Sequence, residues 1–150
     1  MDAVAGGLAG DPIEPGDRVC ILGFTSVDYT TIDVALVLLG AVSVPLQASA
    51  AVAALGPIVA ETEPAVIASS VDYLSVAVGL VLTGHAPERL VVFDYQPQVD
   101  DHREAVDAAR ARLAEMADRR RWNCWLTCWN AVRRGPRRRS TPGRTTRWRR

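Results

Sequence analysis

The segment RVCILGFTSVDYTTIDVALVLLGAVSVPL, residues 18–46, decides the fold of this chain. It opens with a β-rich apolar run at 18–24, which predicts a strand. Ser26 then stands where a helix N-cap belongs, and apolar residues follow it at helical spacing as far as Gly40, which suits a helix C-terminus. A second short apolar run at 41–46 completes a strand–helix–strand unit.

The same alternation continues along the chain. Apolar runs begin near residues 19, 42, 65 and 90, at intervals of about 23 to 25 residues. Between them lie helical patterns, of which 71–84 is expected to be capped by Ser70 and 100–116 to bury Val106, Ala109 and Leu113. The strand runs do not alternate apolar and polar residues, which is typical of parallel strands buried on both faces. We therefore expect an α/β fold with a partial parallel sheet of βαβ units.

Prolines set the expected limits of elements between the second and third runs. Pro45 is expected to end the second strand. Ser49 is expected to cap a brief turn at 50–55. Pro57 suits the first position of a helix better than its interior, so a separate helix is expected from there until just before Pro64.

Charge divides the chain into two unlike parts. Residues 1–116 carry 16 acidic side chains and 5 arginines, whereas 117–150 carry one acid and 12 arginines, together with all four tryptophans. We expect a flexible N-terminus at 1–14, an α/β domain at 15–116 and a disordered basic tail at 117–150. No lysine occurs anywhere, and the abrupt change in composition is what an out-of-frame reading of a GC-rich gene would produce.

Short motifs for nucleotide or hydrolase chemistry are missing. The first strand leads into GFTSVD, which has one glycine, and neither G-x-x-x-x-G-K-[ST] nor G-x-S-x-G occurs. The helix beginning near Val27 could present free N–H groups to an anion, but Ser26 is favoured as a plain N-cap. The other candidates are interpreted as structural: Cys20 as a core residue, His85 and His102 as surface residues, and Asp100 and Asp101 as a favourable helix start.

The basic tail leaves several interpretations open. Cys124 and Cys128 could face one metal ion, but a zinc site needs four ligands and the sequence has no second pair. The mixture of arginine and tryptophan would suit nucleic acid or an anionic membrane surface. WNCWLTCWN (122–130) has no amphipathic pattern, however, and the favoured interpretation is a tail without a selected function.

One segment carries a family resemblance. LLGAVSVPLQASA (38–50) resembles the second core motif of the acyl-adenylating enzymes, and the strand and helix before it match as well. IVAETEPAVIASSVDYL (58–74) and GHAPERLVVFDYQPQVDDHREAVDAARARLA (84–114) resemble, more narrowly, the actinobacterial carboxylic acid reductases, also labelled fatty-acid–CoA ligases. The resemblance extends from residue 15 to about 115.

This resemblance implies activation of a carboxylic or fatty acid with ATP and Mg²⁺ to an acyl-AMP. In full-length carboxylic acid reductases it also implies a phosphopantetheine carrier and NADPH-dependent reduction. The family's phosphate loop, its adenine and Mg²⁺ motif, the ribose-binding aspartate and the C-terminal lysine have no counterpart here. No catalytic, cofactor-binding or metal-binding residue can therefore be assigned in this chain.

We therefore expect a truncated, inactive piece of an acyl-adenylating enzyme. Two alternatives remain: a stand-alone nucleotide- or CoA-binding module, and a nucleic-acid or membrane binder acting through its tail. We expect no nucleic-acid partner, and no specific protein partner can be inferred. The longest apolar stretch, 34–46, is too short for a membrane span, and the start of the chain lacks the features of a signal peptide. Three cysteines form no disulfide framework, so a cytoplasmic location is expected.

Overall fold

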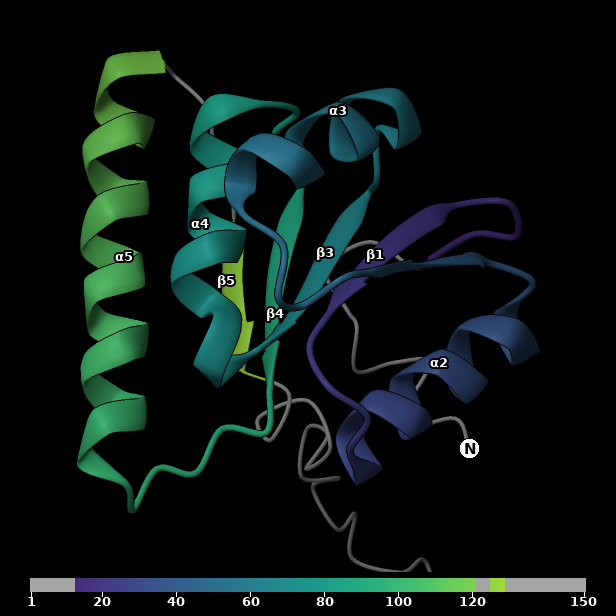
Figure 1. Cartoon of the computed structure of the whole chain (residues 1–150), viewed down its shortest axis with the longest axis horizontal. Helices are drawn as coiled ribbons and strands as arrows, with labels where there is room; N and C mark the ends of the chain where they lie inside the picture. Colours follow the sequence, from purple (N-terminus) through teal and green to yellow (C-terminus); the bar gives the residue numbers. More distant parts are fainter. Residues whose placement is uncertain (1–12, 121–124, 129–150) are drawn as a thin grey trace, which may run out of the picture.

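The computed structural model describes residues 13–120 and 125–128. Over these residues, strands and helices alternate as Figure 1 shows. In chain order the elements are β1 (Arg18–Leu22), α2 (Val27–Leu39), β2 (Val42–Leu46), α3 (Val52–Thr62), β3 (Val66–Ser70), the 3₁₀ helix η1 (Val71–Tyr73), α4 (Leu74–Thr83), β4 (Arg89–Phe93), α5 (Asp100–Arg120) and β5 (Trp125–Cys128).

The described strands form one parallel sheet of five strands in the order β2-β1-β3-β4-β5. Cys20 in β1 stands opposite Val44 of β2 on one side and Ile67 of β3 on the other. The predicted α/β class with a parallel sheet is confirmed. The chain moves outward from β1 to β2, then returns past β1 to β3, so the winding reverses between β1 and β3.

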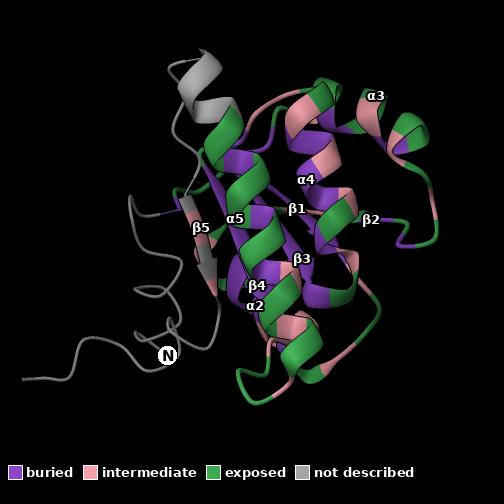
Figure 2. Ribbon diagram, turned by 90° about the vertical axis from the view of Figure 1, so that its left-hand side faces the viewer, coloured by how far each residue is buried: buried purple, intermediate pink, exposed green. Residues whose placement is uncertain are grey.

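Helices cover both faces of the sheet. Ile32 and Leu36 of α2 lie in one buried cluster with Val19 and Ile21 of β1. The opposite face is covered by α3, α4 and α5, whose buried side chains form a second, larger cluster with the strands. Figure 2 shows the buried side of α4 and α5 turned toward the strands and the exposed side turned to solvent. The expected inward residues Val106, Ala109 and Leu113 of α5 are buried, as predicted.

The limits of α2 follow its sequence. The Ser26 hydroxyl accepts a hydrogen bond from the Tyr29 N–H at 3.0 Å, which satisfies one of the unpaired donors of the first turn. At the other end Gly40 takes a left-handed conformation, with φ of 72°, and its N–H bonds back to the last turn. Both predicted helix ends are confirmed.

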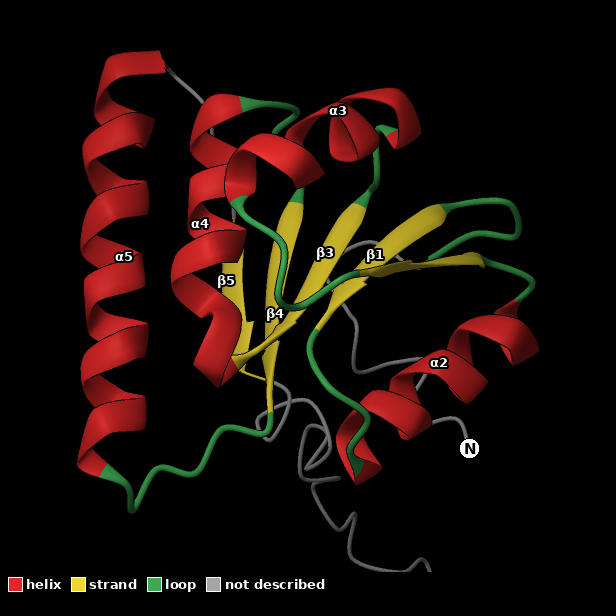
Figure 3. Ribbon diagram, viewed as in Figure 1, coloured by secondary structure: helices red, strands yellow, loops and turns green. Residues whose placement is uncertain are grey.

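Two expectations based on proline are wrong. Strand β2 continues through Pro45 to Leu46, because β2 is an edge strand of the described sheet and pairs with a neighbour on one side alone. Pro57 lies inside α3, which runs without a break from Val52 to Thr62, as the helix ribbon in Figure 3 shows. The missing Pro57 N–H removes one helical hydrogen bond, and burial of Leu55 and Val59 in the core offsets this loss.

The expected cap at Ser70 is also wrong in detail. Its backbone has the extended conformation of an N-cap, but its hydroxyl makes no capping hydrogen bond. The chain forms the 3₁₀ turn η1 before α4 begins at Leu74. The Ser70 hydroxyl is buried and has no hydrogen-bond partner among the described residues.

Regular structure extends beyond residue 116. Helix α5 continues to Arg120, and β5 pairs in parallel with β4, with Leu126 opposite Leu90. Both elements lie beyond 116, the expected end of the α/β domain; the arginines that change the charge also suit a helix, and the next apolar residues suit an edge strand. At the other end Ile13, which falls within the segment 1–14 expected to be flexible, is buried. Residues 129–150 lie outside the described residues.

Candidate functional site

Parallel α/β sheets bind ligands outside the carboxyl ends of their strands, where the winding reverses. In this sheet that point lies between β1 and β3. Gly23 follows β1, Ser70 ends β3, and Asp94 follows β4. These three positions define the edge at which a site is first sought.

The crevice between β1 and β3 is filled by the protein itself. A Cβ atom on Gly23 would lie 2.8 Å from Cζ of Phe93 and 3.1 Å from Cβ of Ser70. Above it, the rings of Phe24 and Tyr73 meet edge to face, with centroids 5.6 Å apart. A side chain larger than that of glycine would therefore clash at position 23.

An open hollow lies beside this filled crevice. Its volume is about 510 Å³, and it is lined by Val27, Asp28, Asp72, Asp94, Tyr95, Gln96 and His102. The carboxylates of Asp28, Asp72 and Asp94 come from α2, η1 and the turn after β4. We call this the acidic hollow.

Hydrogen bonds hold the acidic hollow in shape. The Ser26 hydroxyl donates to Asp94 at 2.9 Å, and the Asp94 N–H donates to the Asp28 carboxylate at 3.3 Å. The Gln96 N–H donates to Nδ1 of His102 at 3.1 Å. Asp94 itself has a positive φ of 54°, a conformation that aspartate tolerates better than most residues. These contacts tie the starts of α2 and α5 to the end of β4.

The charge of the acidic hollow is negative. Partial burial raises the pKa of the Asp94 carboxyl above its ordinary value of 3.8; the bond from Ser26 and the nearby His102 lower it, while Asp28 and Asp72 raise it further. Aspartates so close to the start of α2 favour that helix but repel a phosphate group. The open alternative of an anion site at Val27 is therefore not supported, since the Tyr29 N–H is already bonded to Ser26.

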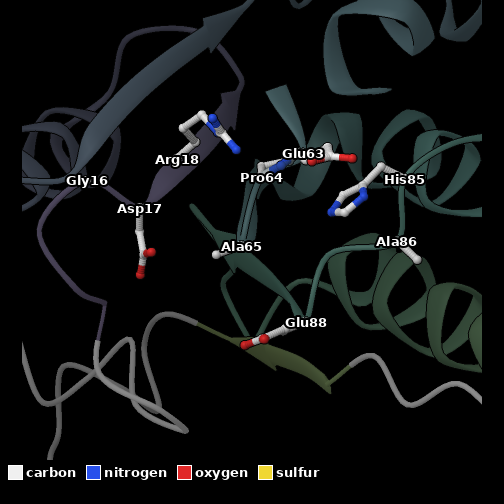
Figure 4. A pocket seen from close by; sticks show the side chains of 9 residues that line it. All are labelled: Gly16, Asp17, Arg18, Glu63, Pro64, Ala65, His85, Ala86 and Glu88. Atoms are coloured by element: carbon white, nitrogen blue, oxygen red, sulfur yellow. The ribbon is translucent and has the colours of Figure 1, made fainter. Parts of the chain in front are cut away.

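A second hollow lies at the opposite edge, near the amino ends of β1, β3 and β4. Its volume is about 450 Å³, and its lining residues are Gly16, Asp17, Arg18, Glu63, Pro64, Ala65, His85, Ala86 and Glu88. Figure 4 shows the Arg18 and His85 side chains extending into it from opposite sides, with Glu63 between them. Its charges are mixed, and this is the edge at which parallel sheets do not usually bind ligands.

The residues weighed from the sequence fall into separate places. Cys20 is fully buried, as predicted, and burial raises the pKa of its thiol, which lies 3.7 Å from the Thr62 hydroxyl. His85 and His102 are half-buried and belong to different hollows. Asp100 and Asp101 lie in the first turn of α5. Cys124 lies outside the described residues, so the structure does not test the hypothesis that Cys124 and Cys128 bind one metal ion.

The acidic hollow was not predicted from the sequence. Its signal was present, because Asp72 and Asp94 each follow a buried strand within two residues, and carboxyl ends of parallel strands meet at one edge. Asp28 could not be placed this way, since it lies a full loop beyond β1. Among the described residues, no group of three His, Cys, Asp or Glu side chains is arranged to hold a metal ion.

Comparison with known proteins identifies this fold. The sequence pattern of the AMP-binding enzyme family matches residues 1–128. This chain belongs to the AMP-binding enzyme family. Over 112 residues it is 69% identical to a carboxylic acid reductase of Mycobacterium tuberculosis, and over 105 residues it is 60% identical to one of Mycobacterium marinum. These matches cover 74% and 70% of this chain.

Solved structures agree with the sequence relatives. The adenylation (A) domain of the Segniliparus rugosus carboxylic acid reductase, solved with AMP and a co-purified carboxylic acid, superimposes with a TM-score of 0.81 at 43% identity. The A domain of a Mycobacterium chelonae carboxylate reductase gives 0.80 at 42% identity. Each match covers 88% of this chain but 21% and 20% of the respective A domain. This AMP-binding family member spans 10% and 9% of the two mycobacterial reductases' own lengths.

The described residues do not themselves fit a nucleotide triphosphate with its metal ion. The edge at which such a ligand would be sought carries carboxylates, and its crevice is filled by Gly23, Phe93 and Ser70. A triphosphate needs cationic groups and free N–H donors to balance its charge. No helix among the described residues is both long and apolar enough to cross a membrane.

Proposed function

We propose that this chain supplies a structural segment of an acyl-adenylating domain, which activates a carboxylic acid with ATP to an acyl-AMP. The proposal rests on one observation above all, the 69% identity to a mycobacterial carboxylic acid reductase. The Segniliparus rugosus A domain, which binds AMP and a carboxylic acid, supports it with the same fold. The cofactors of such a domain would be ATP and Mg²⁺, held by residues outside the matched segment.

The segment alone is expected not to adenylate. Adenylation must stabilise charge that develops on a transferring phosphoryl centre, which requires positioned cations and N–H donors. The acidic hollow offers the opposite charge at the expected edge. The chain therefore contributes the sheet and helices on which the rest of such a domain would assemble.

A domain graft tests this function. The matched segment of the Segniliparus rugosus A domain is replaced by residues 13–128 of this chain, and pyrophosphate release is measured with ATP and a carboxylic acid. We expect the graft to keep its rate within about tenfold of the parent. A folded graft that releases no pyrophosphate would contradict the proposal.

Calorimetric titration of the intact chain tests the stand-alone binding alternative. ATP, AMP and CoA are each expected to give no heat of binding. Saturable heat with any one of them would favour an independent nucleotide- or CoA-binding module instead.

We further propose that residues 129–150 do not belong to the adenylation domain. The family match ends at residue 128, and the basic composition of 117–150 departs from the acidic part before it. The coding DNA can be read in its other two frames beyond this point. Reappearance of the family pattern there would support an out-of-frame origin, whereas early stop codons in both frames would contradict it.

A further inference from the structure

The connection between β4 and α5 is tied to α5 by a histidine. It runs from Asp94 to Val99 and forms the loop at the foot of α5 in Figure 1. The Gln96 N–H donates to Nδ1 of His102 at 3.1 Å, and the Val99 N–H donates to the Gln96 carbonyl at 3.0 Å. Both backbone groups of Gln96 are therefore bonded, and we call its bond to His102 the histidine clasp.

The histidine clasp requires an unprotonated Nδ1. A neutral imidazole carries one proton, and the nitrogen without the proton is its acceptor. Because Nδ1 of His102 accepts from Gln96, the proton of the neutral ring belongs on Nε2. An imidazolium has a proton on each nitrogen and cannot accept a hydrogen bond. Protonation of His102 therefore breaks the clasp.

Carboxylates from three other elements share the acidic hollow with His102. Asp28 comes from α2, Asp72 from η1 and Asp94 from the turn after β4, while the Tyr95 ring lies beside the imidazole with centroids 6.4 Å apart. Burial raises the pKa of the Asp94 carboxyl and the nearby His102 lowers it, so the two groups interact. Among the described residues that line this hollow, His102 is the one side chain able to carry positive charge. An imidazolium here has acidic partners that stabilise it once the clasp is broken.

The cationic residue next to His102 has separate partners. Arg103 is paired with Asp100, and its guanidinium also donates to the Pro97 carbonyl at 2.8 Å. Arginine keeps its charge throughout the pH range in which histidine titrates, so these contacts persist when His102 is protonated. The part of the connection that depends on pH is therefore the part around Gln96.

We infer that the histidine clasp is a pH-sensitive switch in the connection between β4 and α5. When His102 is neutral, Nδ1 holds the Gln96 N–H and the connection is closed against the start of α5. When His102 is protonated, the imidazolium releases Gln96 and pairs with the carboxylates of the acidic hollow. Gln96 and Asp94 both line this hollow, so acid changes its shape and its charge together. The switch lies wholly within this chain and does not depend on the proposed function.

Nuclear magnetic resonance of the intact, ¹⁵N-labelled chain tests the switch. The chain has two histidines, so the His102 signals are assigned by comparison with His85→Gln. At about pH 8 the proton of the His102 ring should be on Nε2. On acidification to about pH 5, protection of the Gln96 N–H from exchange with water should fall by at least about tenfold, at the pH where His102 takes up its proton. A proton on Nδ1 at the higher pH, or protection of Gln96 that does not follow His102, would overturn the inference.

Two substitutions separate the hydrogen bond from the charge. His102→Asn keeps an acceptor atom bonded to Cγ but does not titrate, so the Gln96 N–H should stay protected at both pH values. His102→Ala has no acceptor and should leave the Gln96 N–H unprotected at both. His85→Gln, in the other hollow, is the matched control and should leave the pH dependence of Gln96 unchanged. If Gln96 is as well protected in His102→Ala as in the parent, the histidine clasp does not hold the connection and the inference is wrong.

Discussion

Asp94 shows how a single residue can join two elements, the start of α2 and the end of β4, at some cost in stability. Its carboxylate accepts from Ser26, while its N–H donates to Asp28. Because burial is the main cause of its raised pKa, the folded chain holds the Asp94 proton more tightly than the unfolded chain does. Ionisation of Asp94 therefore lowers stability, and this loss appears as pH rises through 3.8 toward the folded pKa.

Asp94→Asn should remove this pH dependence. The amide oxygen can still accept from Ser26, and asparagine tolerates the positive φ. Urea unfolding between about pH 3 and pH 7 should show the variant gaining stability relative to the parent as pH rises. Asp94→Ala, which loses the bond to Ser26, should be less stable by about 1 kcal/mol near neutral pH. A difference between Asn variant and parent that falls with pH would refute this account.

Gly23→Ala tests the filled crevice. The added methyl would lie 2.8 Å from Phe93, whose ring is fully buried and cannot easily move. Overpacking of this kind should lower the free energy of unfolding by about 1–3 kcal/mol, measured by urea denaturation. An unchanged value would mean that Phe93 and Ser70 can move to accommodate the methyl group, contrary to this account.

At the residue scale the sequence was informative where the chemistry is local. The cap at Ser26 and the left-handed Gly40 depend on neighbouring residues in the chain, and both were predicted. The acidic hollow depends on side chains 66 residues apart, such as Asp28 and Asp94, and so required the strand order. The predicted cap at Ser70 was wrong because its hydroxyl is buried and makes no hydrogen bond to the helix start.

At the scale of elements, α3 and α4 meet through a glycine. A Cβ atom on Gly79 of α4 would lie 2.9 Å from Cγ2 of Val52 on α3, whereas one on Gly56 of α3 would have no neighbour within 4 Å. Both glycines weaken their helices relative to alanine. Alanine at Gly56 therefore tests helix propensity alone, whereas alanine at Gly79 also tests the packing of α4 against α3.

Gly56→Ala should raise the free energy of unfolding by about 0.5–1 kcal/mol, because it adds helix propensity without a clash. Gly79→Ala should give no such gain and should lower stability, since Val52 is β-branched and has few alternative rotamers. Thermal or urea unfolding of the two variants measures both effects. Equal stabilisation at the two sites would show that α3 can move away from α4 freely.

The elements themselves were largely predictable, and the exceptions have a common cause. Apolar runs and helical spacing located the strands and helices because each is buried on the face that its pattern specifies. The predictions from Pro57 and Pro45 were wrong because proline indicates only a local backbone preference. Tertiary features decide at both positions: the burial of Leu55 in the core at α3, and the edge position of β2 in the sheet. A local conformational preference is overridden when tertiary packing stabilises another conformation by a larger free energy.

At the scale of the whole molecule, β5 decides where the described fold ends. Leu126 and Cys128 of β5 are half-buried against the core cluster that includes α5. A chain ending at residue 128 should unfold with the free energy of the full chain. One ending at 116 should lose about 1–3 kcal/mol, because it removes these contacts and exposes β4.

Urea unfolding of the two shortened chains and the full chain measures this difference. If the chain ending at 116 is as stable as the others, the α/β domain ends at 116 as the sequence predicts, and β5 contributes nothing to the free energy of unfolding. The boundary at 116 was predicted from the reversal of charge, which is a property of composition. Composition alone did not reveal that a helix end containing arginine and an apolar edge strand continue the strand–helix alternation beyond it.

The strand order also has a consequence for synthesis on the ribosome. Once β1 and β2 have paired, β3 joins the free edge of β1, and β4 and β5 then each pair with the strand before them in the chain. A nascent chain can therefore extend its sheet as each strand–helix unit emerges, without waiting for distant residues. At every stage the growing edge of the sheet is open to a chaperone until the next strand to leave the exit tunnel pairs with it, while the outer edge of β2 stays unpaired among the described strands.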